Sequence, residues 1–394
     1  MQIKPSYNQI ESLLEKLFNN KIIQYEKSRN FAYFDNDILK NVSGLSPFIS
    51  RGVIKEEFLL RKVINTKKNS NKFIQEIFWR IYWQGWLENH VNVWKRYESQ
   101  LDQIKKSRLI DMKNYKFAIS GNTKIVAFDE WVKILKESGY LHNHVRMWFA
   151  SIWIHYLGIP WQLGANFFYE HLLDGDIASN LLSWRWVAGL QTKGKKYIAT
   201  EENINKYTFN RYGDLKLPKL KDIILDNEEN QKSIINYSKL EKSVKDCAFF
   251  ITENNLNFGS LKNCKYNIKI IVLIRFNFLS INKSKIVLEF HKKLCEEFIN
   301  KFDCKKIKYY EILLPDQKDK LNELLKGNSI KNIIYDYLRC GYEKNIIQNY
   351  FFNLNKNIKI YDVLDDFYVR AWKFCDKGFF KFKDKIPMLL DKLR

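Results

Sequence analysis

The stretch Phe168-Tyr-Glu-His-Leu-Leu-Asp-Gly-Asp-Ile-Ala-Ser-Asn-Leu-Leu-Ser-Trp-Arg-Trp-Val-Ala-Gly189 decides the fold that this sequence predicts. From Asp174 onward it brings two carboxylates, an amide and two indoles into one short segment with helical spacing. Asp176, Asn180 and Trp184 are four residues apart, so a helix would stack them along one face. The pair Asp174-Gly175 precedes them and favours the start of a helix, because a carboxylate there accepts backbone N–H groups.

An amide beside an indole on a buried helix has two interpretations. Both side chains need polar partners when they are buried, and the segment is too aromatic to be a solvated face. The face either recognises a polar ligand or belongs to a buried helix with one hydrogen-bonded asparagine. The stretch by itself favours neither interpretation.

The composition sets the outer limits. A chain of 394 residues predicts two to three domains with ample core. The 66 Lys and Arg residues exceed the 44 Asp and Glu residues and give a formal net charge of +22, which favours polyanions such as nucleic acid. The chain is also rich in Lys, Asn and Ile throughout, so codon bias is another source of part of this charge. The charge alone therefore does not identify a partner.

The cysteines indicate a reducing compartment. None of them forms a CxxC pair or has a histidine at zinc spacing, so we expect a cytoplasmic protein without a metal or iron–sulfur site. The amino-terminal residues lack the apolar core of a signal peptide, and no apolar run reaches membrane-spanning length. The six cysteines are Cys247, Cys264, Cys295, Cys304, Cys340 and Cys375.

The pattern up to about residue 210 is almost entirely helical. Apolar spacing predicts an amphipathic helix over 7–20, one long aromatic helix over 72–97 and a helix pair over 128–157. Pro47 suits the first turn of a further helix, with Ser46 as its N-cap. The free N–H groups of such a helix end can hold a phosphate, although an ordinary capped helix explains the same residues.

Glu76 lies in the long aromatic helix and has two interpretations. It is four residues before Arg80, so the two side chains could form an ordinary salt bridge on the helix surface. An acid set among Phe73, Trp79 and Trp83 instead indicates a site that recognises a polar group.

The rhythm of the chain changes after a polar segment at 213–243, which we expect to be a linker. Short β-branched or aromatic runs then alternate with helical stretches, and this alternation predicts a doubly wound parallel sheet. The predicted fold class is therefore α plus α/β, with a helical domain at 1–212 and an α/β domain at 244–394. The expected strands are 247–252, 267–275, 307–313, 332–337 and 358–363, and the expected helices between them are 284–301, 316–326 and 342–353.

The first half resembles the helical FAD-binding domain of the photolyase/cryptochrome family over roughly residues 25–207. Four motifs in the same order carry this resemblance, and it implies that FAD binds in a bent conformation. The motifs are Ser43-Gly-Leu-Ser-Pro47, Phe73-Ile-Gln-Glu-Ile-Phe-Trp-Arg80, Gly139-Tyr-Leu-His-Asn-His-Val-Arg-Met147, and Asp174-Gly-Asp-Ile-Ala-Ser-Asn180 with Trp184-Arg-Trp186.

The resemblance implies a set of FAD-binding residues. Residues 43–46 match the segment that holds the diphosphate, although Val42 replaces a threonine of the family. Arg146 and Asp174 match a buried ion pair beside the isoalloxazine, and Asn180 matches the residue that faces flavin N5. The full set is Tyr25, Ser43, Gly44, Leu45, Ser46, Arg80, Asn143, Arg146, Asp174, Asp176 and Asn180.

The resemblance also implies residues that act in catalysis. Trp184 matches the indole nearest the flavin, and Trp161 matches the next indole in the chain that carries electrons from the surface. The outermost indole has no clear counterpart, because the region near 104–119 offers only Tyr115 and Phe117. The four expected catalytic residues are Trp184, Trp161, Asn180 and Glu76. Core packing is the other interpretation of the tryptophans.

A pocket for a flipped cyclobutane pyrimidine dimer is implied as well, because two indoles supply faces for bases while a carboxylate and an amide read polar edges. The (6-4) repair branch has a histidine pair where this chain has Asn143 and Met147. His144 replaces an arginine that touches DNA phosphate in the family. The expected substrate and DNA residues are Glu76, Trp79, Asn143, Met147, Trp186, Arg29 and Lys193, the last in a basic loop that is otherwise an ordinary turn.

The domain order departs from the family, whose members place an α/β antenna domain before the flavin domain. Ala248-Phe-Phe-Ile-Thr-Glu-Asn-Asn-Leu256 resembles the first strand of that domain, so the antenna domain is expected at the carboxyl-terminal end. A second, unknown chromophore there is compatible with this pattern but is not indicated by it. An unrelated α/β module is the alternative.

These features lead to one expected function and two alternatives. The expected function is a monomeric photolyase that uses FAD and blue light to repair DNA containing pyrimidine dimers, and it does not involve a membrane. The alternatives are a cryptochrome-like photoreceptor that signals through flavin photoreduction, and a flavoprotein that has lost both activities.

Overall fold

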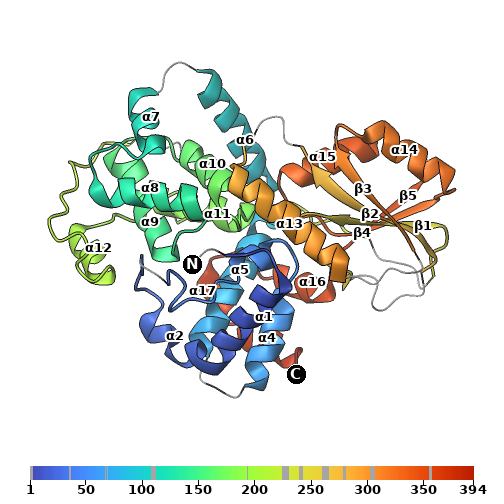
Figure 1. Ribbon diagram of the computed structural model, residues 1–394, viewed down its shortest axis with the longest axis horizontal. Coiled ribbons are helices and arrows are strands. Elements are labelled where there is room, and N and C mark those ends of the chain that lie inside the picture. The colour runs from blue at the N-terminus through green and yellow to red at the C-terminus, as the bar shows by residue number, and fades with distance from the viewer. Residues whose placement is uncertain are drawn as a thin grey trace.

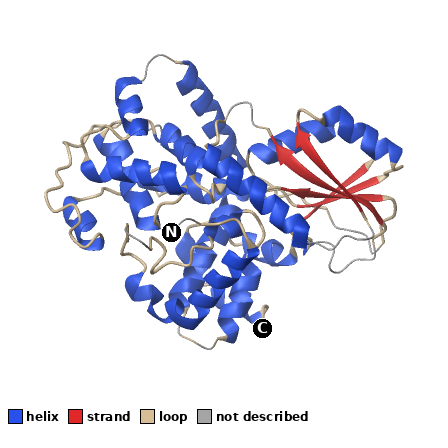
Figure 2. Cartoon of the chain, viewed as in Figure 1, coloured by secondary structure: helices blue, strands red, loops and turns tan. Residues whose placement is uncertain are grey.

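The computed structural model describes residues 3–34, 37–66, 68, 70–107, 112–192, 194–223, 230–238, 243–259, 266–277, 281–301, 307–354 and 357–394. A helical half precedes a parallel sheet, and the predicted fold class is confirmed (Figures 1 and 2). None of the helices in these ranges combines the length and hydrophobicity needed to cross a lipid bilayer.

The helical half contains twelve α-helices in the described residues. They are α1 (Tyr7–Lys16), α2 (Ile22–Ser28), α3 (Ser46–Ser50), α4 (Glu56–Asn65), α5 (Asn71–Asn89), α6 (Val91–Lys106), α7 (Met112–Ser120), α8 (Val126–Ser138), α9 (Asn143–Ser151), α10 (Trp161–His171), α11 (Ile177–Ala188) and α12 (Glu201–Tyr207). Two π-helical turns, Leu17–Lys21 and Ile152–Tyr156, follow α1 and α9.

Two of the predicted helices differ in detail. The helix expected over 72–97 is two helices, because His90 leaves the helical region with φ −138° and ψ 53° between α5 and α6. The helix expected over 7–20 ends its α-helical part at Lys16. The expected pair over 128–157 is present, and Gly139 ends α8 in the left-handed conformation with φ +66°.

The sheet has five parallel strands in the order β3-β2-β1-β4-β5. The chain therefore winds outward from β1 in both directions, as the alternation predicted, and the winding direction changes between β1 and β4. The strands are β1 (Cys247–Thr252), β2 (Ile268–Phe276), β3 (Lys308–Leu314), β4 (Asn332–Asp336) and β5 (Lys359–Val363), with helices α13 (Lys285–Lys301), α14 (Lys318–Gly327) and α15 (Tyr342–Phe352) between them.

Strand β1 is buried on both faces, and alternate side chains enter two different cores. Phe249 and Ile251 join the large core that also contains α13 and the helical half. Ala248 and Phe250 join a smaller core closed by α14 and α15. Helix α13 therefore lies between the sheet and the helical half, where it contacts α8 and α10 (Figure 1).

The chain returns to the helical half after the sheet. Helices α16 (Asp366–Trp372) and α17 (Phe379–Lys383) both contact α5, and α18 (Ile386–Asp391) follows them. The carboxyl terminus consequently lies beside α4, where Arg61 hydrogen-bonds the carbonyl oxygen of Leu393 (Figure 1). The α/β domain was expected to cover residues 244–394. Its last part, residues 366–394, instead packs with the helices of the helical half.

Candidate functional site

Arg146 and Asp174 form the ion pair that the resemblance implied. Arg146 extends from α9, and its Nη1 lies 2.8 Å from Oδ2 of Asp174, which precedes α11. The Arg146 Nε also donates to the carbonyl oxygen of Leu141 at 2.9 Å, and the N–H of Gly175 donates to Oδ1 of Asp174 at 3.1 Å. Their side chains are 22% and 9% exposed, so the pair lies in the wall of the helical half and still reaches solvent.

Arg80 is the centre of a second, larger cluster of charges. Its Nε lies 2.8 Å from Oε1 of Glu56, and its Nη2 lies 2.8 Å from Oδ2 of Asp176 and 3.2 Å from Oγ of Ser50. Glu56 accepts further hydrogen bonds from Gln84 and from the hydroxyl of Tyr368. The cluster therefore connects α4, α5 and α11 with α16.

The carboxylates of this cluster stay ionised despite their burial. Burial alone would raise the pKa of Glu56, but Arg339, Arg80 and the Tyr368 hydroxyl outweigh it and leave that pKa lowered. Burial likewise opposes ionisation of Asp176, yet the neighbouring Arg80 and Arg339 hold its pKa below the ordinary value. Glu56 was not predicted from sequence, because an acid in the first turn of a helix normally has a capping role.

Helix α11 presents a polar face that its neighbours do not fully cover. Asp176 is its N-cap and accepts from the N–H of Ser179 at 2.8 Å, so the expected start at Asp174-Gly175 is two residues early. Asn180 donates to the carbonyl oxygen of Ala165 at 2.8 Å. Both Asp176 and Asn180 are only half-buried, whereas Trp184 on the next turn is buried. The structure thus brings a carboxylate and an amide onto one accessible face.

The loop before α3 is held in a tight turn. Gly44 has φ +69°, and a Cβ there would lie 2.9 Å from Cδ1 of Leu39. The Oγ of Ser43 accepts from the N–H of Leu45 at 3.3 Å. Leu45, rather than Ser46, occupies the N-cap position of α3, and the expected capping role of Ser46 is wrong.

Trp184 lies against helix α10 among other rings. A Cβ on Gly164 would come within 2.2 Å of this indole, so only glycine lets α10 approach so closely. The neighbouring rings are Phe168 at 5.1 Å, Trp153 at 6.0 Å and Phe149 at 6.4 Å between centroids. The Nε1 of Trp184 is buried without a hydrogen-bond partner among the described residues.

Trp153 extends this contact toward the surface. Its ring centroid lies 6.0 Å from Trp184 and 6.0 Å from the half-buried Tyr115. Trp161 instead stacks on Tyr97 at 5.7 Å and is not among the rings in contact with Trp184 in the described part of the chain. Sequence reasoning missed Trp153, because its position in a π-helical turn is not visible in a helical repeat.

Glu76 does not form the predicted alternative salt bridge with Arg80. Its Oε1 lies 3.2 Å from Nη1 of Arg29 and 3.4 Å from Nζ of Lys72. Arg29 and Glu76 were both expected to meet the substrate, and the structure does bring them together. Tyr25 lies beside them, with its ring edge-on to Phe73 at 5.1 Å.

The other expected substrate residues lie on three elements. Trp79 on α5 stacks on Phe379 of α17 with 3.5 Å between ring centroids, so one face of this indole is covered. Asn143 and Met147 adjoin on α9, where Nδ2 lies 4.0 Å from the sulfur. Trp186 stacks on Tyr197 at 5.3 Å. Lys193 lies outside the described residues.

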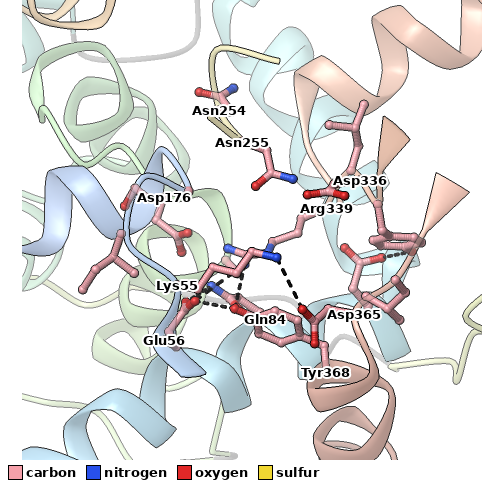
Figure 3. A pocket seen from close by; sticks show the side chains of 18 of the residues that line it. Lys55, Glu56, Gln84, Asp176, Asn254, Asn255, Asp336, Arg339, Asp365 and Tyr368 are labelled. Atoms are coloured by element: carbon pink, nitrogen blue, oxygen red, sulfur yellow. Dashed lines mark hydrogen bonds and ion pairs between the residues drawn. The ribbon is translucent and has the colours of Figure 1, made fainter. Parts of the chain in front are cut away.

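A cleft separates the helical half from the carboxyl ends of β1, β4 and β5 (Figure 3). Its volume is about 610 Å³, and charged and amide side chains make up nearly half of its lining residues. Lys55 bridges part of it through Asp365 at 3.3 Å. The crevice at the point where the winding direction of a doubly wound sheet reverses is the usual ligand site of such folds. The labelled lining residues are Lys55, Glu56, Gln84, Asp176, Asn254, Asn255, Asp336, Arg339, Asp365 and Tyr368.

Comparison with known proteins finds similarity to the family that the motifs resemble. Residues 73–216 match the model of the FAD binding domain of DNA photolyase. A deoxyribodipyrimidine photo-lyase of Buchnera aphidicola subsp. Acyrthosiphon pisum is 28% identical over 50% of this chain and 44% of that protein. One from Agrobacterium fabrum is 30% identical over 45% of this chain and 36% of that protein. The chain thus spans less than half the length of these relatives.

A solved structure was also similar. The cryptochrome of Synechocystis sp. PCC6803 aligns with a TM-score of 0.45 and 20% identity, over 51% of this chain and 43% of that chain.

Proposed function

We propose that this chain is a light-driven DNA photolyase specific for cyclobutane pyrimidine dimers, because residues 73–216 match the model of the FAD binding domain of DNA photolyase. The observation that carries the proposal is the ion pair of the half-buried Arg146 with the buried Asp174, beside the half-buried polar face of α11. Bound, reduced FAD would supply the electron that splits the dimer after absorption of blue light.

The residues present fit this cofactor. A guanidinium–carboxylate pair and the amide of Asn180 offer donors and acceptors suited to the polar edge of a flavin. Ser43 and Ser46 are half-buried on either side of the tight turn at Gly44, so their hydroxyl groups could hold a diphosphate. In this proposal Arg146 and Asp174 orient the ring, and Asn180 lies at its reactive edge.

Glu76, Trp79, Asn143, Met147 and Trp186 would receive the flipped dimer. The contacts of Glu76 with Arg29 and Lys72 support this role, because the two cations fix the orientation of the carboxylate. Trp79 has one face on Phe379, so it offers a base only its other face.

Trp184, Trp153 and Tyr115 form the route by which we propose that the protein delivers electrons from the surface. Trp153 would replace an electron lost from Trp184. Tyr115 would then replace the electron lost from Trp153 and release its phenolic proton to solvent. The two ring separations of 6.0 Å support this route. Trp161, the expected second member, would then act mainly in packing against Tyr97.

A cryptochrome-like photoreceptor is the second candidate. It is favoured by His144, whose Nδ1 lies 3.0 Å from the carbonyl oxygen of Asn30 and whose ring stacks on Trp148. The imidazole of His144 therefore makes its contacts within the protein. In repair enzymes of the family, an arginine at this position touches DNA phosphate.

The cleft between the two halves is the site at which we propose that a second chromophore binds. Its position at the reversal of the sheet supports a ligand there. We further propose a cytoplasmic monomer: Cys247, Cys295, Cys340 and Cys375 are buried free thiols, as suits a reducing compartment.

The proposal is tested by measuring repair directly. Purified protein is reduced, illuminated with blue light and supplied with an oligonucleotide that contains one thymine dimer, and restored thymines are quantified. We expect repair only in the light, a flavin absorption spectrum, and loss of dimer binding in Trp186→Ala with the flavin retained. A flavin that photoreduces without any dimer repair would favour the photoreceptor instead.

A further inference from the structure

A row of aromatic rings leads outward from the proposed lesion pocket along the surface of the helical half. His144 lies 4.8 Å from Tyr207, and Tyr207 lies 5.2 Å from Phe31, between ring centroids. Phe31 stacks on Phe209 with 5.0 Å between ring centroids. The ring of Tyr33 also lies 5.0 Å from that of Phe209. We call these five residues the aromatic row. Two segments distant in sequence, 31–33 and 207–209, build most of it.

Phe209 is held outward by an unusual backbone. Its side chain is 57% exposed, although burying a phenylalanine is ordinarily worth about 2 kcal/mol. Phe209 and Asn210 both have positive φ, at +55° and +58°, a conformation that costs a residue with a side chain roughly 1 kcal/mol. Backbone strain of this kind concentrates where function requires a particular display.

Basic side chains accompany the rings. The Nζ of Lys40 lies 4.8 Å from the centre of the Tyr33 ring, and that of Lys206 lies 5.5 Å from Tyr207. Both lysines are exposed. At the inner end of the row, Asn30 hydrogen-bonds His144 and is followed by Phe31, while the preceding Arg29 pairs with Glu76. The row is therefore continuous with the residues assigned to the dimer.

We propose that the aromatic row binds unpaired nucleotides of the lesion-bearing strand, so that this protein prefers single-stranded DNA to duplex DNA. Aromatic rings stack on the faces of any bases, and neighbouring lysines neutralise the phosphates between them. In a duplex the bases are already stacked and paired, and the row would gain little from them. The inference rests on the proposed function for its substrate class.

The charges favour nucleic acid over other occupants of this surface. A protein partner or a second copy of this chain would cover exposed rings equally well, but the formal net charge of +22 opposes self-association. Lys40 and Lys206 lie at the rings and would attract the phosphates of a polyanion. In an apolar protein interface, by contrast, both ammonium groups would lose their hydration at a cost in free energy.

The test uses undamaged DNA in the dark, so that its result does not depend on repair. Binding of fluorescein-labelled oligo(dT) of 16 nucleotides, and of a duplex of equal length, is measured by fluorescence anisotropy at fixed salt. Phe209→Ala should weaken oligo(dT) binding about 10-fold and duplex binding less than about 2-fold, while Phe209→Trp retains stacking. The control is Phe352→Ala, which removes a phenylalanine that is 89% exposed on α15 and should change neither affinity.

Three results of these binding measurements would overturn the inference. Unchanged oligo(dT) binding in Phe209→Ala, an equal loss for duplex, or an equal loss in Phe352→Ala would overturn the inference while leaving the proposed repair activity untouched. A dimeric wild type that becomes monomeric in Phe209→Ala, seen by sedimentation, would assign the surface to a second copy. Selective loss of oligo(dT) binding in a protein that repairs no dimer would retain the row and reject only the photolyase proposal.

Discussion

Two arginines of the helical half, Arg80 on α5 and Arg146 on α9, differ sharply in how the chain uses them. Arg146 pairs with one carboxylate, Asp174, and both residues come from the helical half. Arg80 pairs with Glu56 and Asp176 at once, and the same Glu56 also binds Tyr368, which comes from the far end of the chain. Side-chain exposure is 22% for Arg146 and 13% for Arg80.

The difference separates a local site from a structural connection. An ion pair formed within one half, with an exposed edge, has capacity left for a ligand. A buried network whose members come from α4, α5, α11 and α16 instead fixes the carboxyl-terminal helices onto the amino-terminal ones. The first arrangement should therefore control cofactor binding, and the second should control stability.

Replacing Arg80 should give the largest effect. Arg80→Ala removes the arginine that pairs with both the buried Glu56 and the half-buried Asp176, and losing one partner of such a network costs about 3–5 kcal/mol of unfolding free energy. Urea denaturation followed by circular dichroism measures this. Lys106→Ala, which removes an exposed pair with Asp102, is the control and should cost at most about 0.5 kcal/mol. Equal losses in the two variants would contradict the comparison.

Replacing Arg146 should give a smaller loss of stability and a larger loss of flavin. Arg146→Ala leaves a single carboxylate, which keeps the N–H of Gly175, so we expect a loss of roughly 1–3 kcal/mol. The flavin-to-protein absorbance ratio after purification should fall, and Arg146→Lys should restore part of it. A stability loss as large as that of Arg80→Ala, with flavin retained, would show that the two arginines have the same role.

Removing one hydroxyl from the network should give the smallest effect, and it should depend on pH. Tyr368→Phe costs about 1 kcal/mol at neutral pH through the lost hydrogen bond to Glu56. The folded state lowers the pKa of Glu56 from the ordinary 4.5, so the stabilisation is present above that pH and is lost as the pH falls through the lowered pKa. The variant should reduce this acid sensitivity, measured as urea midpoints from pH 6 to pH 3. An identical pH profile would argue that Tyr368 does not act on Glu56.

The sheet was predictable because its signals are local. The five runs of β-branched and aromatic residues became β1 to β5 with boundaries within two residues of those expected. The inner strands β1, β2 and β4 are largely buried, and strands of that kind read as continuous apolar runs. The pair Arg146–Asp174 was also foreseen, from the order of the motifs. By contrast, no periodicity marks His90 as a break, because the residues on both sides of it have helical patterns.

The amino-acid sequence by itself determined the helical half, the parallel sheet after it and the polar face of α11, because each depends on residues a few positions apart. Only the tertiary structure decided that α16 and α17 return to α5, that Trp153 rather than Trp161 lies beside Trp184, and that Phe31 meets Phe209. These contacts join residues separated by up to hundreds of positions, and their partners are selected by packing across the whole chain, which leaves no mark in any single stretch.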